Sequence, residues 1–216
     1  MMKSGIIRNT KKMVLLNVLF CLMTNISHAF NPASFHEMEK TRPHQCVDCD
    51  LSGMEIVGWE MDDAILRGAD MRGANLSQTE FESADLRGAD LREANVFNIV
   101  LSRANLSNAN LSRLNLGSAT INDADLSGAN LRETNFNGGT LLGANMSGAN
   151  LKQAICRGAN LRLTNLSNAE LSDAFLDNAD LRGANLNGAK LKGSSLSGAI
   201  WIDGRTCKPG SVGECK

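Results

Sequence analysis

Cysteine side chains are the groups of this sequence whose spacing most directly indicates chemistry. Cys46 and Cys49 are separated by two residues, a spacing that occurs both in thiol–disulfide redox motifs and in metal sites. Cys207 and Cys215 lie near the end of the chain, so the two pairs together offer the set of thiols that a structural zinc site can use. The choice among these chemistries depends on where the rest of the chain places the two pairs.

The elements that must position these groups follow a five-residue repeat. From Leu51 to Trp201 every fifth residue is apolar, without a slip in register. These central positions number 31 and 21 of them are leucine, so the pattern is too regular to follow from composition alone. The residue two places before the central one is alanine in 21 repeats, and the residue between them is Asp or Asn in 18. A small, a polar and an apolar residue therefore recur in fixed order.

A period of five fits neither a 3.6-residue helix nor a two-residue strand. The regular solution is a turn in every repeat, with the alanine and leucine positions pointing inward and the other three outward. Asn, Asp, Gly and Ser are frequent at the outward positions, and these residues accept tight-turn geometry. Four turns close a square coil, and stacked coils repeat at about 4.8 Å. We therefore expect a column of just under eight coils, on the order of 37 Å tall.

The repeats resemble a known motif, Ala-(Asp/Asn)-Leu-X-X, which is that of the pentapeptide repeat protein family. Runs that carry the resemblance include Ala69-Asp70-Met71 and Ala129-Asn130-Leu131. The resemblance implies an all-β fold, a right-handed quadrilateral β-helix, in which the repeats form a solenoid. The tail from Trp201 to Cys215 is similar to the tryptophan-containing, two-cysteine ending of many exported members. The expected segments are a signal peptide 1–29, an N-terminal leading or capping segment 30–48, the repeat β-helix 49–203 and a C-terminal cap 204–216.

Residues 1–29 have the order of a secretory signal peptide. Four basic residues and no acid come first, followed by the apolar run from Val14 to Met23 and a polar stretch that ends at Ala29. We expect cleavage after Ala29. The apolar run is too short to span a bilayer, which needs roughly 20 residues, so a single-pass anchor is the weaker alternative. Phe20 before Cys21 disfavours a lipoprotein signal. The protein is expected to be exported, to the periplasm or the cell exterior, with no membrane span after cleavage.

Export changes how the cysteines are interpreted, because an oxidising compartment favours disulfides. The two pairs lie at opposite ends of the expected column, far beyond a Zn–S bond of about 2.3 Å, which excludes a shared zinc site. A redox role for Cys46 and Cys49 would need a thioredoxin-like context that the chain lacks. We therefore expect two structural disulfides, Cys46–Cys49 and Cys207–Cys215. Cys156 occupies a central inward position and is expected to be a buried small hydrophobe.

The sequence does not favour an enzyme. Catalysis needs titratable groups that converge in a cleft, but the chain has no tyrosine, and His36 and His44 both precede the repeats. The carboxylates of the repeats are expected on a convex surface. A general base among His44, Asp48 and Asp50 is the remaining alternative, and nothing in the repeats would enclose its substrate. No cofactor or metal site is expected.

The net charge and its distribution along the chain decide how well an alternative function fits the repeats. The formal net charge of -1 lacks the basic signature of nucleic-acid-binding proteins, so no nucleic acid partner is expected. From Asp48 to Glu93 there are 12 acidic and 4 basic residues, but from Ala94 to Ala169 there are 3 and 6. Some family members imitate DNA and bind gyrase through long acidic surfaces. An acidic DNA mimic that inhibits or protects a topoisomerase is therefore the alternative, disfavoured by the short acidic stretch and the signal peptide.

Apolar residues at outward positions are the candidates for contacts with a partner. We select Phe97, Val100, Ile155 and Phe175 as the candidate contact surface. Ile155 and Phe175 are 20 residues apart and should stack in adjacent coils, where shielding of each other is the alternative role. The sequence thus predicts a non-enzymatic exported protein-interaction or scaffold module, with an unknown protein or envelope component as partner and an open oligomeric state. Outward positions that are normally polar are apolar at Ile65, Phe97, Val100, Leu142, Ile155, Leu163 and Phe175.

Overall fold

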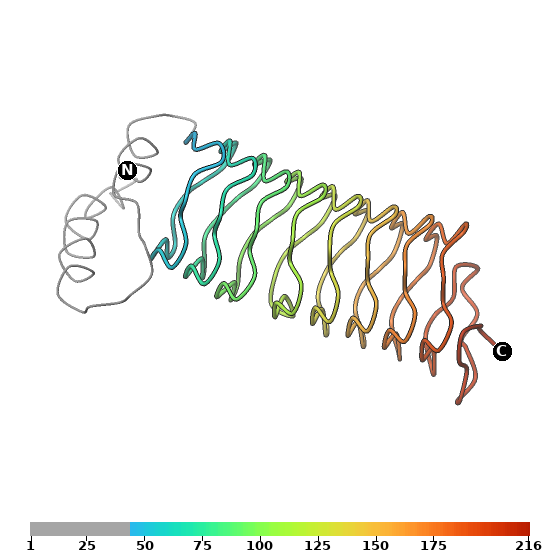
Figure 1. Ribbon diagram of the computed structural model, residues 1–216. Coiled ribbons are helices and arrows are strands. Elements are labelled where there is room, and N and C mark those ends of the chain that lie inside the picture. Colours follow the sequence, from blue (N-terminus) through green and yellow to red (C-terminus); the bar gives the residue numbers. More distant parts are fainter. Residues whose placement is uncertain (1–43) are drawn as a thin grey trace, which may run out of the picture.

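The protein forms an elongated column in which one coil follows another (Figure 1). The computed structural model describes residues 44–216. The expected signal peptide, residues 1–29, and residues 30–43 of the expected leading segment lie outside the described residues.

Eight square coils of 20 residues make up the column. Each coil has four sides, called faces 1 to 4 in chain order, and bridge residues on a face pair in parallel with those of neighbouring coils. In coil 2 the bridge residues of faces 1 to 4 are Ile65, Asp70, Asn75 and Glu80. The described residues contain no helix and no strand longer than a single bridge residue. The coils span residues 44–63, 64–83, 84–103, 104–123, 124–143, 144–163, 164–183 and 184–203.

The coils start one turn earlier than the sequence indicated. Gln45 bridges Ile65, and Cys46 occupies an inward central position with 7% of its surface exposed. Residues 44–48 therefore belong to coil 1 instead of a separate leading segment. The motif is hidden there because His44 stands in place of the small inward residue and Cys46 in place of leucine.

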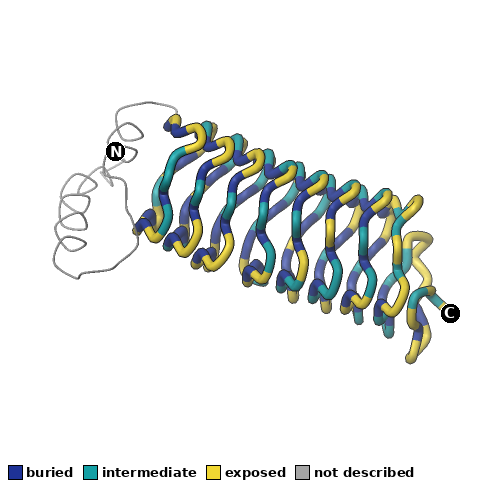
Figure 2. Tube along the Cα trace, in the orientation of Figure 1, coloured by how far each residue is buried: buried dark blue, intermediate teal, exposed yellow. Residues whose placement is uncertain are grey.

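Inward side chains form one continuous apolar core along the column, and buried residues recur in every coil (Figure 2). The central residues of coils 2–7 are at most 2% exposed, and each buried leucine stabilises the fold by roughly 1.5–3 kcal/mol. Some inward positions hold a hydroxyl in place of alanine, and each of these hydroxyls donates a hydrogen bond to a backbone carbonyl. The pairs are Thr79 to Ile56, Thr134 to Leu111, Thr164 to Leu161 and Ser194 to Leu171.

Each corner of the coil is a tight turn. In coil 2 the Ala69 N–H donates to the Leu66 carbonyl at 3.2 Å, and Gly68, the third residue of the turn, has a φ of 65°. A type II turn requires this left-handed conformation at its third residue. Every equivalent residue between positions 48 and 198 shares it except Ser118. The backbone at the corners therefore favours Gly, Asn and Asp, as the sequence pattern indicated.

Backbone hydrogen bonds join each coil to the next, with one interruption on face 3. Among the bridges of the described residues, the one expected between Asn95 and Asn115, in coils 3 and 4, is absent. The Asn98 N–H donates to the Ser118 hydroxyl at 3.0 Å instead of to a backbone carbonyl. Two local departures from the motif accompany the interruption: the corner with Ser118 is not left-handed, and Leu114 stands where most repeats have alanine.

The tail after coil 8, residues 204–216, turns back over faces 3 and 4. Ile200 pairs with Thr206 and Ser195 with Val212, both in antiparallel bridges. Faces 1 and 2 of coil 8 receive no such cover from the described residues. The tail therefore closes only half of the column end.

Candidate functional site

The outer faces are the part of the column that can carry a function, because the interior is filled by side chains of the repeats. Among the described residues, no buried side-chain nitrogen or oxygen lacks a hydrogen-bond partner. The same residues contain no cluster of three or more His, Cys, Asp or Glu side chains that could hold a metal ion. Within residues 44–216, no helix is long and apolar enough to cross a membrane.

The four predicted contact residues lie in two separate places. Phe97 lies at the corner between faces 3 and 4 of coil 3 and is 56% exposed, while Val100 follows on face 4 and is half-buried. Ile155 and Phe175 occupy bridge positions of face 3 in coils 6 and 7. Coils 4 and 5 separate the two places. The structure therefore brings Ile155 and Phe175 together but does not join them to Phe97 and Val100.

Ile155 and Phe175 end the asparagine row of face 3. Asn135 pairs with Ile155 from one side, and Ile155 pairs with Phe175 from the other. The Phe175 side chain is 37% exposed and Ile155 is half-buried. The guanidinium carbon of Arg157 lies 4.6 Å from the Phe175 ring centroid, and Arg157 Nε lies 3.3 Å from Asp177 Oδ2. One side of the ring is thus covered by a cation–π contact, which an aspartate holds in place.

Leu163 is the most exposed large hydrophobic residue that the structure describes, at 63%. It is the third residue of a corner turn and has a φ of 58°. Among the non-glycine residues of the described column with this conformation, it has the one apolar side chain. The stacked corner positions in the neighbouring coils are Gly143 and Gly183, which have no side chains to surround it. Leu163 is not among the four predicted contact residues. The signal that could have identified it is an apolar residue at the left-handed position of a repeat.

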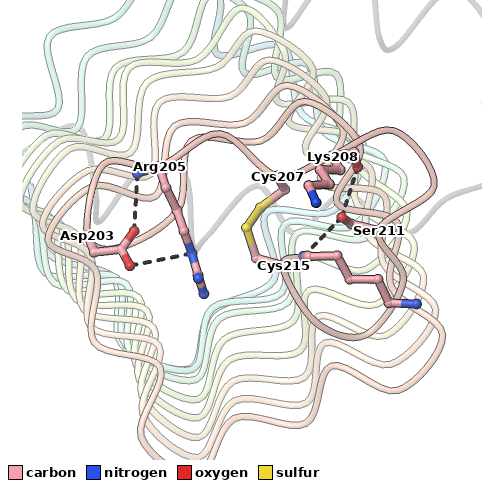
Figure 3. The surroundings of a disulfide bond; sticks show 7 residues. Asp203, Arg205, Cys207, Lys208, Ser211 and Cys215 are labelled. Atoms are coloured by element: carbon pink, nitrogen blue, oxygen red, sulfur yellow. Dashed lines mark hydrogen bonds and ion pairs between the residues drawn. A yellow bond between two sulfur atoms is a disulfide. The ribbon is translucent and has the colours of Figure 1, made fainter.

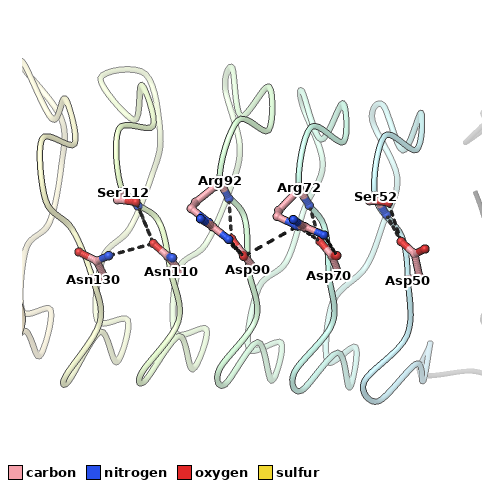
Figure 4. Close-up of polar contacts among 9 residues, drawn as sticks. All are labelled: Asp50, Ser52, Asp70, Arg72, Asp90, Arg92, Asn110, Ser112 and Asn130. Carbon is pink, nitrogen blue, oxygen red and sulfur yellow. Dashed lines mark hydrogen bonds and ion pairs between the residues drawn. The ribbon is translucent and has the colours of Figure 1, made fainter. Parts of the chain in front are cut away.

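Acid–arginine units recur on the outer faces. Arg72 Nη2 lies 2.5 Å from Asp70 Oδ2 and its Nε lies 2.8 Å from Asp70 Oδ1, a bidentate pair (Figure 4). The hydrogen bond from the Arg72 side chain lowers the pKa of Asp70 below its ordinary value of 3.8. The same two-residue spacing forms a bidentate unit in three more places, Asp85–Arg87, Asp90–Arg92 and Asp180–Arg182.

Asparagine rows join the coils by side-chain hydrogen bonds. On face 2 the Asn130 amide donates to Asn110 Oδ1 at 3.1 Å (Figure 4). On face 1, Asn145, Asn165 and Asn185 each donate to the side chain 20 residues earlier, at 3.0 to 3.2 Å. These residues are engaged in stacking, so they are a structural feature and not the best candidates for a binding site.

Acidic side chains gather on face 4 at the start of the column. Glu60 and Glu80 occupy its bridge positions, and Asp62 and Glu82 follow at the corners. Arg103 forms an ion pair with Glu82. Further along the same face the bridge positions of coils 3–6 hold Val, Thr and Asn, and that of coil 7 holds Asp180, which is paired with Arg182. The continuous run of acidic residues on face 4 therefore ends after two coils.

The two cysteine pairs lie at opposite ends of the column. The Sγ atoms of Cys46 and Cys49 are 2.01 Å apart, and those of Cys207 and Cys215 are 2.03 Å apart (Figure 3). The structure therefore places both predicted pairs at disulfide distance and keeps them too far apart to share a metal ion. Cys156 is a free thiol in the core, 1% exposed, and burial raises its pKa to about 12.

Comparison with solved structures finds the same architecture. HetL from the cyanobacterium Nostoc sp. strain PCC 7120, a pentapeptide repeat protein involved in heterocyst differentiation regulation, is 26% identical with a TM-score of 0.52. The match covers 82% of this chain and 100% of HetL. Trypsin-treated QnrB1, a plasmid-mediated fluoroquinolone resistance protein, is 18% identical with a TM-score of 0.67, over 72% of this chain and 78% of its own. At that identity the likeness to QnrB1 concerns the fold alone.

Comparison with sequences gives the family. No curated protein matches the chain. The family model for pentapeptide repeats matches residues 45–82, 60–98, 99–138, 129–168, 144–183 and 159–198. These segments cover most of the chain and lie within the column of coils, residues 44–203. The protein therefore belongs to the pentapeptide repeat family, and its fold is the right-handed quadrilateral β-helix of that family.

Proposed function

We propose that this protein is a non-enzymatic, exported binding or scaffold module that holds a protein or an envelope component on the outside of its column. The observation that carries the proposal is the replacement of the face 3 asparagine row by Ile155 and the partly exposed Phe175. An aromatic anchor beside an aliphatic neighbour is the usual chemistry of interface hot spots. A rigid solenoid also presents the extended surfaces that repeat proteins use for binding.

The placement of the titratable groups supports a role without catalysis. Asp70, Asp85 and Asp180 point outward and are engaged by arginines two residues away. The inward hydroxyls are engaged by backbone carbonyls. Such groups stabilise the coils and do not converge on a bound substrate. HetL, which is involved in regulation of heterocyst differentiation, is an example of a regulatory role on this fold.

A DNA mimic that acts on a topoisomerase is supported less well. The acidic side chains of face 4 extend over two coils, and several acids elsewhere are neutralised by bidentate arginines. A same-sign field over a long surface is what such mimicry needs. The signal-like residues 1–29 also favour export, to the periplasm or the cell exterior, where the two cysteine pairs can stay oxidised.

The proposal is tested by capture of partners from the envelope fraction of the source cells. The variant Ile155→Asn plus Phe175→Asn restores the asparagine row and should leave the circular dichroism spectrum unchanged. We expect it to recover clearly less of the partners that the wild-type column captures. The loss is expected because the apolar contact area has been removed while the coil hydrogen bonds remain.

The matched control is Thr120→Asn plus Thr140→Asn, which introduces the same residue at bridge positions of adjacent coils on face 4. This control should capture partners as well as the wild type does. Equal recovery by all three proteins would overturn the role of the Ile155–Phe175 pair. Absence of any partner in every compartment would overturn the binding function as a whole.

A further inference from the structure

The end of the column that follows coil 8 is closed on one half and open on the other. The tail pairs with Ser195 on face 3 and with Ile200 on face 4. Figure 3 shows the tail and its disulfide lying across part of the end. Within residues 44–216, no segment pairs with faces 1 and 2 of coil 8 on the side that points away from coil 7. A ninth layer is therefore half built.

The open half exposes a row of backbone groups in the geometry of a parallel bridge. In coil 7 the Leu171 N–H donates to the Lys190 carbonyl at 2.8 Å, and the Lys190 N–H donates to the Ala169 carbonyl at 2.9 Å. One coil later, the equivalent Leu191 N–H and Ala189 carbonyl have no backbone partner among the described residues. On face 1 the Leu186 N–H, the Gly188 N–H and the Ala184 carbonyl likewise have no backbone partner among the described residues. Unpaired edges of this kind accept an added strand.

Apolar side chains line the same edge. Leu186 and Leu191 are central residues of their repeats, yet both are partly exposed, and so is the inward Ala189. In coils 2–7 the equivalent residues are covered by the next coil and are at most 2% exposed. An added strand would cover them with its own inward side chains, which would have to be small and apolar in the order of the repeat.

The charge next to the edge specifies the outward residue of such a strand. Lys190 is the last bridge residue of face 2, and its Nζ lies 3.1 Å from Glu170 Oε2 in the coil before. A residue added in the next layer would stack on Lys190 from its other side, with Lys192 beside it. In residues 184–216 five bases, Lys190, Lys192, Arg205, Lys208 and Lys216, stand against the acids Asp203 and Glu214. An acidic residue fits this slot.

We propose that this edge, residues 184–191, binds an acidic peptide segment of a partner protein by strand addition, with a turn in the peptide beside the Gly188 corner. The residue opposite Lys190 is acidic, donates its N–H to the Ala189 carbonyl and accepts from the Leu191 N–H. The following residue is apolar and lies on Leu191. The inference rests on the proposed binding function and names one site and one partner class for it.

A single strand fits this edge better than a second column does. The tail occupies the ninth layer over faces 3 and 4, so another flat column end would meet the tail before it reached Leu186 and Leu191. Two copies that met tail to tail would also bring their basic ends together, which repels. A strand lies beside the tail in the same layer.

The direct test uses a labelled peptide with the sequence of residues 77–86, in which Asp85 is flanked by Ala84 and Leu86. Fluorescence anisotropy with the purified chain should give saturable binding, weaker by about tenfold or more for a peptide methylated on the Asp85 nitrogen. The methyl group removes the N–H that pairs with Ala189 but keeps the charge. Binding should also slow amide exchange at Leu186 and Leu191 and leave the amides of face 3 unchanged.

The role of the Lys190 and Lys192 charges is tested by reversing the charges on the column and on the peptide. The variant Lys190→Glu plus Lys192→Glu should lose the acidic peptide and bind a peptide in which Glu80, Glu82 and Asp85 are replaced by lysine. No saturable binding, equal binding of the methylated peptide, or protection of amides elsewhere would overturn the proposal. Self-association in light scattering that the Lys190→Glu change abolishes would identify a second copy as the occupant and also overturn it. Failure here together with intact capture of envelope partners by the wild type leaves the proposed function standing.

Discussion

Arg157 lies over the aromatic ring of Phe175, with its guanidinium carbon 4.6 Å from the ring centroid. The two residues come from adjacent coils, and Asp177, in the same coil as Phe175, has its Oδ2 3.3 Å from Arg157 Nε. A partner that binds Phe175 therefore meets a ring whose one side is already occupied by a cation. Arg157 therefore lies beside the proposed contact residues Ile155 and Phe175, although the sequence did not single it out.

Removing the cation should uncover the ring. Arg157→Ala is expected to lower the free energy of unfolding by about 0.5–1 kcal/mol, the value of an exposed cation–π contact. It should also increase binding of a hydrophobic dye, because more of Phe175 becomes accessible. Urea denaturation and dye fluorescence measure the two effects, with Arg162→Ala as the control from the neighbouring corner. Identical behaviour of the two variants would show that the stacked geometry does not persist in solution.

Substitutions of an inward and an outward residue in the same coil should differ strongly in their effect on stability. Leu126 is 0% exposed in a middle coil, so Leu126→Ala should destabilise the column by about 2–5 kcal/mol, and Leu126→Asp should unfold or fragment it. Arg132 bonds Glu133 and Gln153 on the surface, so Arg132→Ala should cost at most about 0.5 kcal/mol. Thermal unfolding separates these outcomes. Equal melting temperatures for Leu126→Asp and Arg132→Ala would contradict the inward assignment.

Much of the column could be predicted from the sequence because its order is local. A fixed spacing of five determines which side chains point inward, and residues such as Leu126 and Cys156 follow from it directly. The start at residue 44 could not be predicted, because His44 and Cys46 depart from the motif and are recognised only by the bridge from Gln45 to Ile65.

The unpredicted features depend on contacts between coils. The lost bridge between Asn95 and Asn115 involves two residues that match the motif perfectly well by type. Likewise, Leu186 and Leu191 look like every other central leucine, and only the path of the tail shows that they stay partly exposed. A period identifies rows of residues, whereas the register of neighbouring coils and the reach of the tail decide what covers each row.

Thiol counting tests the two ends and the core together. For the chain that begins at residue 30, alkylation in denaturant without reductant should label one cysteine, Cys156, and full reduction should make all five available. In the folded protein Cys156 should react slowly, because it is buried and its pKa is raised to about 12, which leaves little thiolate at neutral pH. Mass spectrometry provides the count. Two or more labels on Cys46, Cys49, Cys207 or Cys215 before reduction, or stoichiometric zinc, would exclude the disulfide account.

Acid should weaken the column over a defined range. Side-chain hydrogen bonds from Arg72, Arg87 and Arg182 lower the pKa values of Asp70, Asp85 and Asp180 below 3.8. A carboxyl group whose pKa is lower in the folded state contributes stability above its unfolded pKa, and that contribution is lost as the pH falls through the folded value.

The melting temperature should therefore be steady from neutral pH down to about pH 5 and fall between about pH 4 and pH 2. Replacing the three aspartates by asparagine should lower the melting temperature at neutral pH by a few degrees at most, because exposed ion pairs contribute little. The same variant should show a shallower decline in acid. Parallel pH profiles for the wild type and the variant would show that other groups control acid stability.

Leu163 provides the prediction of a gain in stability. An L-residue with a bulky side chain is strained at a φ of 58°, and left-handed backbone costs such residues roughly 1–2 kcal/mol. Leu163→Asn should raise the free energy of unfolding by about 1 kcal/mol, because asparagine accepts this conformation, although the contact of Leu163 with the Gly183 corner is lost. Leu142→Asn, on the same face but at a half-buried position outside the left-handed set, should not stabilise. Chemical denaturation of the two variants measures the difference. If Leu163→Asn is stabilised yet captures less partner from the envelope fraction, the strain is retained for contact; if it is destabilised, the leucine is a packing residue and the strain argument is wrong.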